Sequence, residues 1–318
     1  MDHVTQFRGL LFSVAFYTAL CLMSPETFSQ EITAVKLAVW GERGGRAGQF
    51  ADPQSISVDP AGFLYIADTG NHRIQKLSSA GDPVAEIGGF GWEKEQFREP
   101  VDVSARNGLD VFIADCANGR IERYDKDLHY LATFRPSEAW EEHLRFEYPC
   151  SVCLSNQGEL FCLDEENRRV LKLDVQGQPQ ISFGDFDAGE GRLLRPRRIF
   201  VTSADRVCVT DQDGGRVAVF DIHGNFLYTM GEGLLAQPLG MAEMSGARLV
   251  VADPESRCVL VFRPNGTIAA RIGGEDSAVH FARPVDVACW RDRMYILDQS
   301  RCTVDVFRWT KIGDADSR

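Results

Sequence analysis

The chain has little of what most catalytic and nucleic-acid-binding sites need. It has 6 histidines in 318 residues, and it contains no His-Glu-x-x-His, no Gly-x-Ser-x-Gly and no phosphate-binding glycine loop. Its formal net charge is −12, whereas non-specific nucleic-acid binding depends on clustered Lys and Arg. These absences argue against common zinc-peptidase, serine-hydrolase and phosphate-loop classes, and we expect no nucleic-acid partner.

Long apolar segments are also scarce, and the clearest one lies near the N-terminus. Residues 9–23 are apolar, follow Arg8 and end at Ser24, and small residues precede Gln30. A basic residue, a short apolar run and small residues form the pattern of a secretory signal peptide. We therefore expect cleavage near Ser29, a secreted or periplasmic protein and no other membrane contact. An uncleaved membrane anchor is the alternative, although a spanning helix usually needs ~20 apolar residues.

The main feature that the sequence does contain is a short pattern that returns six times, about every 45 residues. In the first copy, Asp68 is followed by Asn71, Arg73 and then apolar residues; the last two copies lack the Arg at this position. The six aspartates are Asp68, Asp115, Asp164, Asp211, Asp253 and Asp298, and each follows one of six prolines, Pro53, Pro100, Pro149, Pro196, Pro238 and Pro284. A fixed period of this length indicates a propeller, a solenoid or an array.

Each repeat reads as four short strands. In the first repeat, residues 55–58, 63–67, 73–77 and 84–87 are rich in branched and aromatic side chains and are separated by Gly, Pro, Asn and Asp. The repeats show no sustained helical period. Four strands in about 45 residues are typical of a β-propeller blade. We therefore predict an all-β, six-bladed β-propeller of four-stranded blades.

The two ends of the repeat array predict how the ring closes. The sixth repeat lacks a fourth strand, and a spare strand at residues 35–40 precedes the first repeat. Pairing of these two edges removes unpaired backbone groups from the sheet. We predict that the N-terminal strand completes the C-terminal blade, with a signal peptide at 1–29, the propeller at 30–311 and a tail at 312–318.

Two segments carry a resemblance to a known family. Residues 66–75 (IADTGNHRIQ) and 113–121 (IADCANGRI) resemble the signature of NHL repeats, and the resemblance extends over about residues 33–310. The resemblance implies a six-bladed propeller, which agrees with the repeat count. NHL domains serve as binding modules, and some bind RNA through a basic face that this acidic chain does not suggest. Similar propellers include lyases and lactonases that act at one mouth of the channel.

We interpret the repeated Asp and Arg as structural, because a feature of every blade is normally part of what builds a blade. Asp and Asn bond to nearby backbone in tight turns, and Arg can pair with the Asp of its own blade or the next. Function is then expected where the blades differ.

The blades differ at the second position after each proline, at the start of the strands expected to line the channel. These candidate ligand-binding residues at the channel mouth are Ser55, Asp102, Ser151, Arg198, Gly240 and Asp286. An Arg that faces two carboxylates is suited to a polar or zwitterionic ligand. The alternative is that the three charges neutralise one another and close the channel together with water.

The rim around the same mouth also varies between blades. We predict a partner-binding surface that contains Trp92, Trp140, Tyr148, Arg195 and Arg283, because exposed aromatic and Arg side chains often dominate protein interfaces. The expected partner is a protein or a peptide, with an envelope glycan as an alternative.

Eight cysteines follow the predicted signal peptide, at irregular positions. Cys150 and Cys153 are three apart in one strand, so they should point to opposite faces and make a poor redox or metal pair. We expect buried thiols, with a bridge from Cys162 as an alternative, and no cofactor, metal or catalytic residue. Binding is favoured over catalysis; the alternative is a metal-dependent lyase or hydrolase at the channel mouth.

Overall fold

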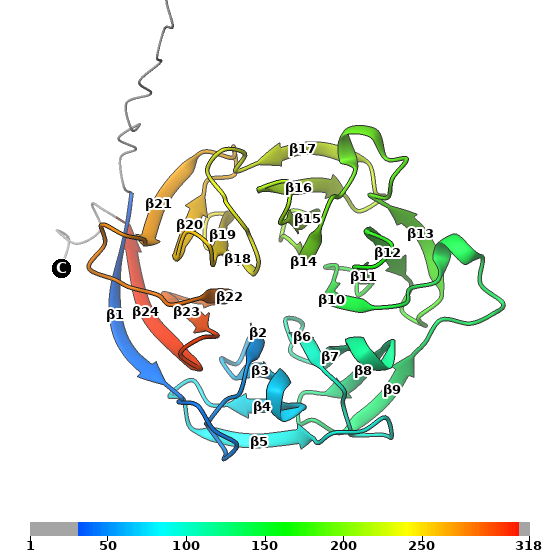
Figure 1. The fold of residues 1–318 in the computed structure, drawn as a ribbon, viewed down its shortest axis with the longest axis horizontal. Coiled ribbons are helices and arrows are strands. Elements are labelled where there is room, and N and C mark those ends of the chain that lie inside the picture. Colours follow the sequence, from blue (N-terminus) through cyan, green and yellow to red (C-terminus); the bar gives the residue numbers. More distant parts are fainter. Residues whose placement is uncertain (1–30, 312–318) are drawn as a thin grey trace, which may run out of the picture.

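The computed structural model describes residues 31–311, which form six four-stranded antiparallel sheets arranged around a central axis (Figure 1). The predicted fold class and blade number are therefore confirmed. The predicted signal peptide at 1–29 and the tail at 312–318 lie outside the described residues. Within 31–311, no helix is long and apolar enough to cross a membrane.

The blades follow the sequence repeats in order. Blade 1 contains β2 (Pro53–Val58), β3 (Leu64–Asp68), β4 (Arg73–Leu77) and β5 (Pro83–Gly88); blade 2 contains β6 (Pro100–Ser104), β7 (Asp110–Asp115), β8 (Arg120–Asp125) and β9 (Tyr130–Phe134). Blade 3 contains β10 (Pro149–Leu154), β11 (Leu160–Asp164), β12 (Arg169–Leu173) and β13 (Pro179–Phe183); blade 4 contains β14 (Pro196–Val201), β15 (Arg206–Asp211), β16 (Arg216–Asp221) and β17 (Phe226–Met230).

The last two blades complete the ring. Blade 5 contains β18 (Met241–Met244), β19 (Arg248–Asp253), β20 (Cys258–Phe262) and β21 (Ile268–Gly273); blade 6 contains β22 (Pro284–Trp290), β23 (Arg293–Asp298), β24 (Thr303–Lys311) and β1 (Ile32–Trp40). Four short 3₁₀ turns lie at the described connections: η1 (Thr69–Asn71), η2 (Cys116–Asn118), η3 (Glu142–Leu144) and η4 (Gly189–Gly191).

The hydrophobic core lies between neighbouring blades. The second and third strands are buried on both faces, as in β3 and β4, where every residue is buried. Core clusters combine adjacent blades; one joins Phe262 of blade 5 to Phe200 of blade 4. Each sheet therefore needs both of its neighbours, because one sheet alone leaves its apolar faces in water.

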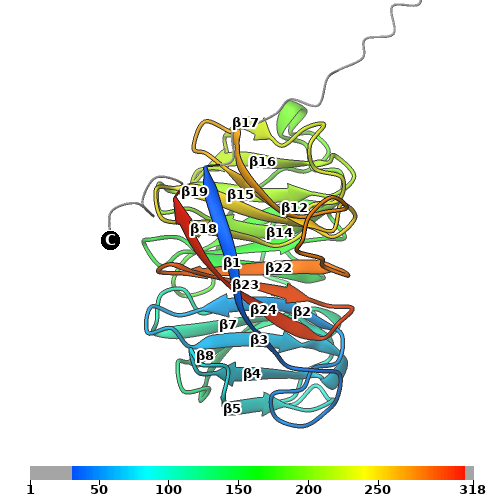
Figure 2. The same cartoon turned by 90° about the vertical axis from the view of Figure 1, so that its left-hand side faces the viewer.

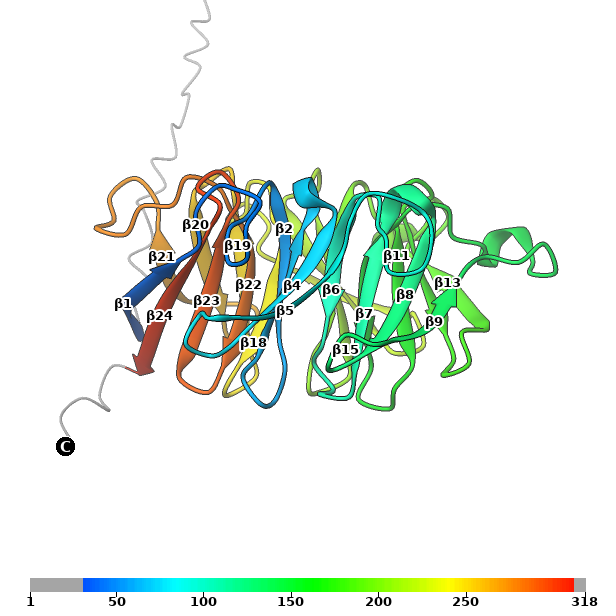
Figure 3. The same ribbon diagram turned by 90° about the horizontal axis from the view of Figure 1, so that it is seen from below.

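The two faces of the disc are formed by different connections (Figure 3). The first strand of each blade begins on one side of the disc, and the fourth strand ends on that same side. We call this side the proline face. Its segments between blades are 41–52, 89–99, 135–148, 184–195, 231–240 and 274–283. The first strands end on the opposite face. The segment with η3 projects outward from the disc (Figures 1 and 3).

The ring closes as the sequence predicts. β1 pairs antiparallel with β24 from Ile32↔Lys311 to Trp40↔Val304, so the first described strand completes the last blade (Figure 2). The Lys36 ammonium lies 2.6 Å from the buried Asp305 carboxylate, which adds an ion pair across the closure. The register shifts between Lys36 and Ala38, and this bulge is the main irregularity in the pairing.

One first strand departs from the repeat. The prolines of the other five blades begin their first strands, but β18 begins at Met241, three residues after Pro238. Here the Gly240 N–H donates to the Val285 carbonyl of blade 6, at 2.9 Å, and its own carbonyl accepts from Ala252. The segment before β18 therefore bonds both to β19 of its own blade, through Ala252, and to the first strand of the next blade, through Val285.

The repeated Asp holds the segment that leads into its own blade. Asp68 is fully buried; its Oδ1 accepts the Ala51 N–H at 2.6 Å, and its Oδ2 accepts from Asn71 at 2.8 Å and Arg73 at 2.7 Å. The equivalent Asp accepts a backbone N–H from the residues just before the proline in all six blades. This arrangement confirms the structural interpretation of the pattern.

The repeated Arg extends the same attachment into the loop. Arg120 donates from Nε to Asp115 at 2.7 Å, and its other nitrogens donate to the carbonyls of Trp92, Glu93 and Gln96 at 2.9, 3.1 and 2.5 Å. Its partner is the Asp of its own blade. Buried charge-assisted bonds are strong and geometrically specific. The bonds of Arg120 therefore hold the backbone of segment 89–99 in place on the proline face.

We predict that removal of residues 1–40 destabilises the propeller much more than removal of residues 1–30. The longer deletion removes β1, leaves the β24 edge unpaired and takes Lys36 away from the buried Asp305 carboxylate, which keeps only the Arg301 guanidinium, at 3.4 Å, of its two described ion-pair partners. We expect the melting temperature to fall by roughly 10 °C or more, which corresponds to several kcal/mol for a domain of this size. Circular dichroism would measure it, and equal melting temperatures for the two deletions would contradict the closure.

Candidate functional site

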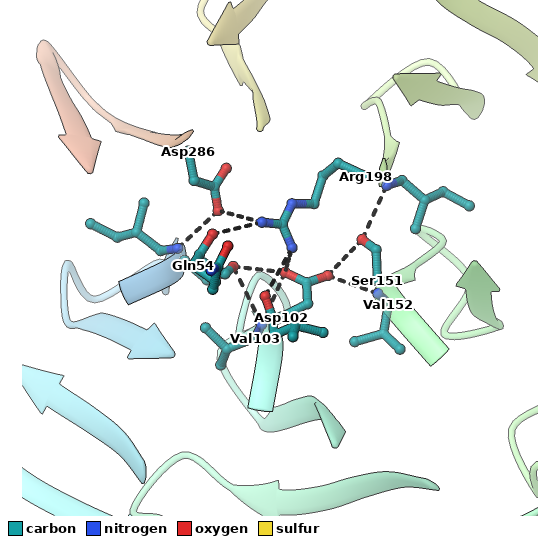
Figure 4. A network of polar contacts seen from close by, with 12 residues as sticks. Gln54, Asp102, Val103, Ser151, Val152, Arg198 and Asp286 are labelled. Carbon is teal, nitrogen blue, oxygen red and sulfur yellow. Dashed lines mark hydrogen bonds and ion pairs between the residues drawn. The ribbon is translucent and has the colours of Figure 1, made fainter. Parts of the chain in front are cut away.

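Of the six candidate channel residues, the structure places Asp102 and Asp286 at the Arg198 guanidinium, with Ser55 and Ser151 bonded to Asp102 (Figure 4). Arg198 extends from β14 across the channel, and its Nη1 lies 2.7 Å from Asp102 Oδ1 while its Nη2 lies 3.7 Å from Asp286 Oδ2. Nη2 also donates to the Gln54 carbonyl at 2.8 Å. Burial opposes the charged form of Arg198, but the two carboxylates together outweigh it and raise its pKa. We call this group, with Ser55 and Ser151, the arginine cluster.

Asp102 joins three blades within the arginine cluster. Its Oδ1 accepts from the Ser55 hydroxyl at 2.7 Å, and its Oδ2 accepts from the Ser151 hydroxyl at 2.6 Å and the Val152 N–H at 2.8 Å. Both oxygens are therefore bonded by groups from blades 1 and 3. A carboxylate bonded in this way fixes the relative positions of its neighbours as well as their charge balance.

A regular bond between adjacent first strands explains why oxygen-bearing side chains occur here. The Asp286 carboxylate of blade 6 accepts the Ile56 N–H of blade 1 at 2.9 Å, and the Ser151 hydroxyl of blade 3 accepts the Ile199 N–H of blade 4 at 3.1 Å. Asp102 and Ser55 make the equivalent bond to the next blade. Arg198 and Gly240 cannot accept such a bond, so blades 4 and 5 depart from the pattern.

Blades 4 and 5 are joined on the opposite face instead. The Glu243 carboxylate of blade 5 accepts from the Ser203 N–H and hydroxyl of blade 4 at 2.7 and 2.8 Å. Gly240 has no room for a side chain, because a Cβ there would lie 2.0 Å from Asp286 Oδ1. Glycine at this position thus permits the close approach of blades 5 and 6.

The arginine cluster divides the channel into two spaces. On the proline face lies a small depression of about 120 Å³, lined by Gln54, Val101, Cys150 and Arg197 among others. On the other side, a cavity of about 230 Å³ extends along the first strands to their ends, and it is lined by Ser55, Asp102, Arg198 and Asp286 at one end. We call this larger space the channel cavity. The binding of a ligand by the arginine cluster stays a prediction.

Sequence reasoning missed the far end of the channel cavity. Arg106, Phe200, Glu243 and Trp290 line it on the opposite face. They lie further along the same first strands or just past their ends. The alternation of side chains along a strand could therefore have placed them beside the channel. The variation at the second position after each proline points only to the starts of these strands.

The predicted rim residues lie on the proline face, with different degrees of exposure. Trp92 is 68% exposed and Tyr148 is 48% exposed, whereas Trp140 is half-buried and packs near Phe146, with 6.3 Å between ring centres. The expectation that Trp140 is freely exposed is therefore wrong, because its ring covers the core beneath the loop. Sequence reasoning also missed Phe90, which is 64% exposed beside Trp92.

The two rim arginines already have partners within the chain. Arg195 lies 3.7 Å from Asp213, and Arg283 donates from Nε to the Gln299 side chain at 2.7 Å. Both side chains are exposed, so these contacts are easily exchanged for a partner's groups.

Comparisons with known proteins agree with the fold and the repeats. A family model described as NHL repeat matches residues 50–77, which hold most of blade 1. A curated relative, "Protein brain tumor" of Drosophila melanogaster, is 24% identical over 131 residues, which are 41% of this chain and 13% of that protein. The chain therefore corresponds to a small part of this relative. The chain is a six-bladed β-propeller with an NHL repeat in its first blade.

Solved structures similar to this NHL propeller share its fold. A streptogramin B lyase has a TM-score of 0.61 and 10% identity, with 88% of this chain and 98% of that chain covered. A virginiamycin B lyase from Staphylococcus aureus, with quinupristin, has a TM-score of 0.58 and 13% identity, with 86% and 88% covered. A protein of unknown function from Bacteroides thetaiotaomicron has a TM-score of 0.63 and 13% identity, with 89% and 77% covered. At these identities the likeness shows the architecture alone.

The cysteines of this NHL propeller are free thiols in the described residues. Cys150, Cys153 and Cys162 are buried, and no disulfide joins them. Burial raises the pKa of Cys208 to about 12, and that of Cys116 to a similar value, so these thiols stay protonated and unreactive at neutral pH. In residues 31–311, no three His, Cys, Asp or Glu side chains are grouped so as to hold a metal ion.

Asp286 is the titrating member of the arginine cluster. Burial is the largest cause that raises its pKa, to about 6; the nearby Asp102 charge adds to this and the Arg198 charge opposes it. The folded protein thus binds a proton on Asp286 more tightly than the unfolded chain does. Stability from this group is complete below the ordinary Asp pKa and is lost as the pH rises through about 6.

We predict that Asp286→Asn removes part of the loss of stability between pH 4 and pH 7. The amide cannot ionise, so the free energy of unfolding of the variant should gain up to about 3 kcal/mol relative to wild type across this range. Urea denaturation of both proteins at pH 4, 5.5 and 7 measures the difference. A difference in stability that stays constant with pH would show that Asp286 does not titrate in this range.

Proposed function

We propose that this NHL propeller is an exported scaffold that binds a protein or a peptide on its proline face. The observation that carries the proposal is the exposed aromatic pair Phe90 and Trp92, held on a segment whose backbone is bonded to a buried Arg. Large apolar side chains exposed on a fixed backbone are typical anchors of protein interfaces, because little conformational entropy is lost when they bind.

The loop that carries Trp92 supports this role. Arg120 bonds to three of its carbonyls, including that of Trp92, and Asp115 accepts the Arg98 N–H at 2.7 Å. The aromatic side chain itself is free of this framework and faces solvent. Tyr148, in the segment before blade 3, adds an exposed aromatic to Phe90 and Trp92 on the same face. The proline face thus combines a rigid backbone with exposed anchors.

The charge around Trp92 suggests the kind of partner. The same segment exposes three acidic residues, Glu93, Glu95 and Glu99, and two basic residues, Lys94 and Arg98. Aromatic anchors surrounded by carboxylates favour a partner segment that carries apolar and basic side chains. An envelope glycan is the competing ligand class, because carbohydrates also stack on exposed aromatic rings.

The lyase or hydrolase alternative rests on weaker support. Two of the similar structures are lyases by their titles, but identities of 10% and 13% extend the likeness to the fold alone. The binding proposal, which rests on the exposed aromatic side chains of the proline face, is therefore the one we retain.

We predict that Trp92→Ala and Tyr148→Ala each reduce partner recovery roughly tenfold or more, as expected for interface anchors. Trp92→Ala keeps the main-chain carbonyl that accepts from Arg120, so the loop should keep its shape. The matched control is Leu109→Ala, since Leu109 is 70% exposed in a turn on the opposite face. The wild-type and variant proteins would serve as bait in extracts of the native host, with quantitative mass spectrometry of what is retained.

The outcome of this experiment separates the ligand classes. Loss of a specific protein with both rim variants but not with Leu109→Ala supports the proposal. Unchanged recovery with both rim variants contradicts it, and rim-dependent retention of a polysaccharide with no protein would replace it by glycan binding.

Export is the second part of the proposal, and the sequence pattern of residues 9–29 supports it. We predict that protein isolated from the native host begins near residue 30. N-terminal sequencing measures this directly. A chain that retains residue 8 and stays in the cytosol would contradict export, and one that retains it in the membrane would indicate an uncleaved anchor.

A further inference from the structure

The channel cavity has a different chemistry from the proline face. Its floor is the arginine cluster, and its walls are the first strands. At its mouth, on the opposite face, lie Arg106, Glu243 and Trp290. A volume of about 230 Å³ accommodates a small organic molecule, since a single water needs only ~10–15 Å³. This space is separate from the predicted rim and does not depend on the function proposed for it.

Arg106 is held at the mouth but keeps unused hydrogen-bond donors. Its guanidinium lies 4.0 Å from the centre of the Phe200 ring, and Nη1 donates to the Val201 carbonyl at 2.5 Å. Within residues 31–311, its Nε and Nη2 donate to no protein acceptor, and Arg106 forms no ion pair. Stacking on an aromatic ring, one backbone bond and a bond from Nη1 to the Cys153 Sγ at 3.8 Å fix the planar group, which leaves the Nε and Nη2 edge of its donor fork available. Such an edge matches the two oxygens of a carboxylate.

The cavity lining carries more acidic than basic side chains, which disfavours a simple anion. Two guanidinium groups, those of Arg106 and Arg198, face four carboxyl groups. The four are Asp59, Asp102, Asp286 and Glu243. On the floor, the one bond that Asp286 Oδ1 accepts from within residues 31–311 comes from the Val287 N–H at 2.9 Å, which leaves a lone pair available. An isolated anion would meet excess negative charge, whereas an isolated cation would leave the Arg106 donors unpaired.

We propose that the channel cavity binds a small zwitterionic amino acid, with its carboxylate on Arg106 at the mouth and its ammonium group near Asp286 on the floor. The ligand brings one negative group to the available donors and one positive group to the excess carboxylate charge. Its carbon chain then lies along the apolar part of the wall, where Phe200, Ala242 and Ala288 line the cavity. Recognition of both ends in one enclosed space also excludes molecules that carry only one of the two charges.

The test is a binding titration of the full-length protein by calorimetry with matched ligands. The probes are a series of α-amino acids together with 4-aminobutyrate and 6-aminohexanoate, which vary the distance between the two charges. Each compound that binds is then compared with its N-acetyl form, which is an anion, and its methyl ester, which is a cation. We expect at least one zwitterion to bind saturably with one site, and both modified forms to bind about tenfold or more weakly.

Variants assign the site to the cavity. Arg106→Gln is expected to reduce affinity for the zwitterion about tenfold or more while leaving the weak binding of the methyl ester unchanged. The control is Arg206→Gln, because Arg206 is exposed on the same face but lies outside the cavity lining. Arg106→Lys keeps the charge and loses the fork, so it provides an intermediate case if Arg106→Gln melts at a lower temperature than wild type.

Three results would overturn the proposal. The first is the absence of saturable binding by every zwitterion in the series to the wild-type protein, a measurement that needs no variant. The second is equal affinity for a zwitterion and for its N-acetyl or ester form. The third is equal affinity in wild-type and Arg106→Gln proteins that both remain folded.

Discussion

A buried carboxylate in each blade accepts the backbone N–H groups of the segment that leads into that blade, and this interaction governs the rest of the structure. Burying an Asp is costly unless its oxygens are bonded, and here each oxygen has a donor, as in Asp115 with Arg98, Asn118 and Arg120. The segment cannot move without unpairing the carboxylate. The same bonds that build the blade therefore fix the surface of the proline face.

The second constraint is closure of the ring. Six sheets cover one another's apolar faces only if the last sheet meets the first, and β1 paired with β24 provides the missing edge. Within the channel, side chains from the first strands bond to the backbone of the next blade, as Asp286 does to Ile56. At blade 4 the series stops, because Arg198 cannot accept such a bond. Its guanidinium instead forms ion pairs with Asp102 and Asp286 across the channel. The channel is thereby divided into a shallow proline side and a deeper cavity that opens on the opposite face.

Much of the fold could be predicted because its determinants are local and repeated. The proline at or just before the start of the first strand and the Asp that ends the second recur in every copy, so six copies indicate six blades. The strand missing from the last repeat is visible as a spare strand before the first repeat. The clustering of Arg198 with Asp102 and Asp286 was also foreseeable, because equivalent positions in a closed ring face one axis.

Other features depend on neighbours that the repeat does not reveal. The late start of β18 results from a bond between Gly240 and Val285 of another blade. The partial burial of Trp140 depends on its packing against Phe146. The channel cavity arises from the lengths of the first strands and from Arg106, whose role depends on Phe200 two blades away around the ring. None of these contacts recurs from blade to blade, so the repeat pattern does not predict them.

The most direct measurement of the central claim is hydrogen exchange at individual amides of the segments on the proline face. The N–H groups of Ala51, Arg98, Ala236 and Ala282 lie outside strands but donate to Asp68, Asp115, Asp253 and Asp298 at 2.6 to 2.7 Å. We expect these amides to exchange as slowly as those of the central strands. Exchange at the rate of ordinary exposed loops would contradict the claim.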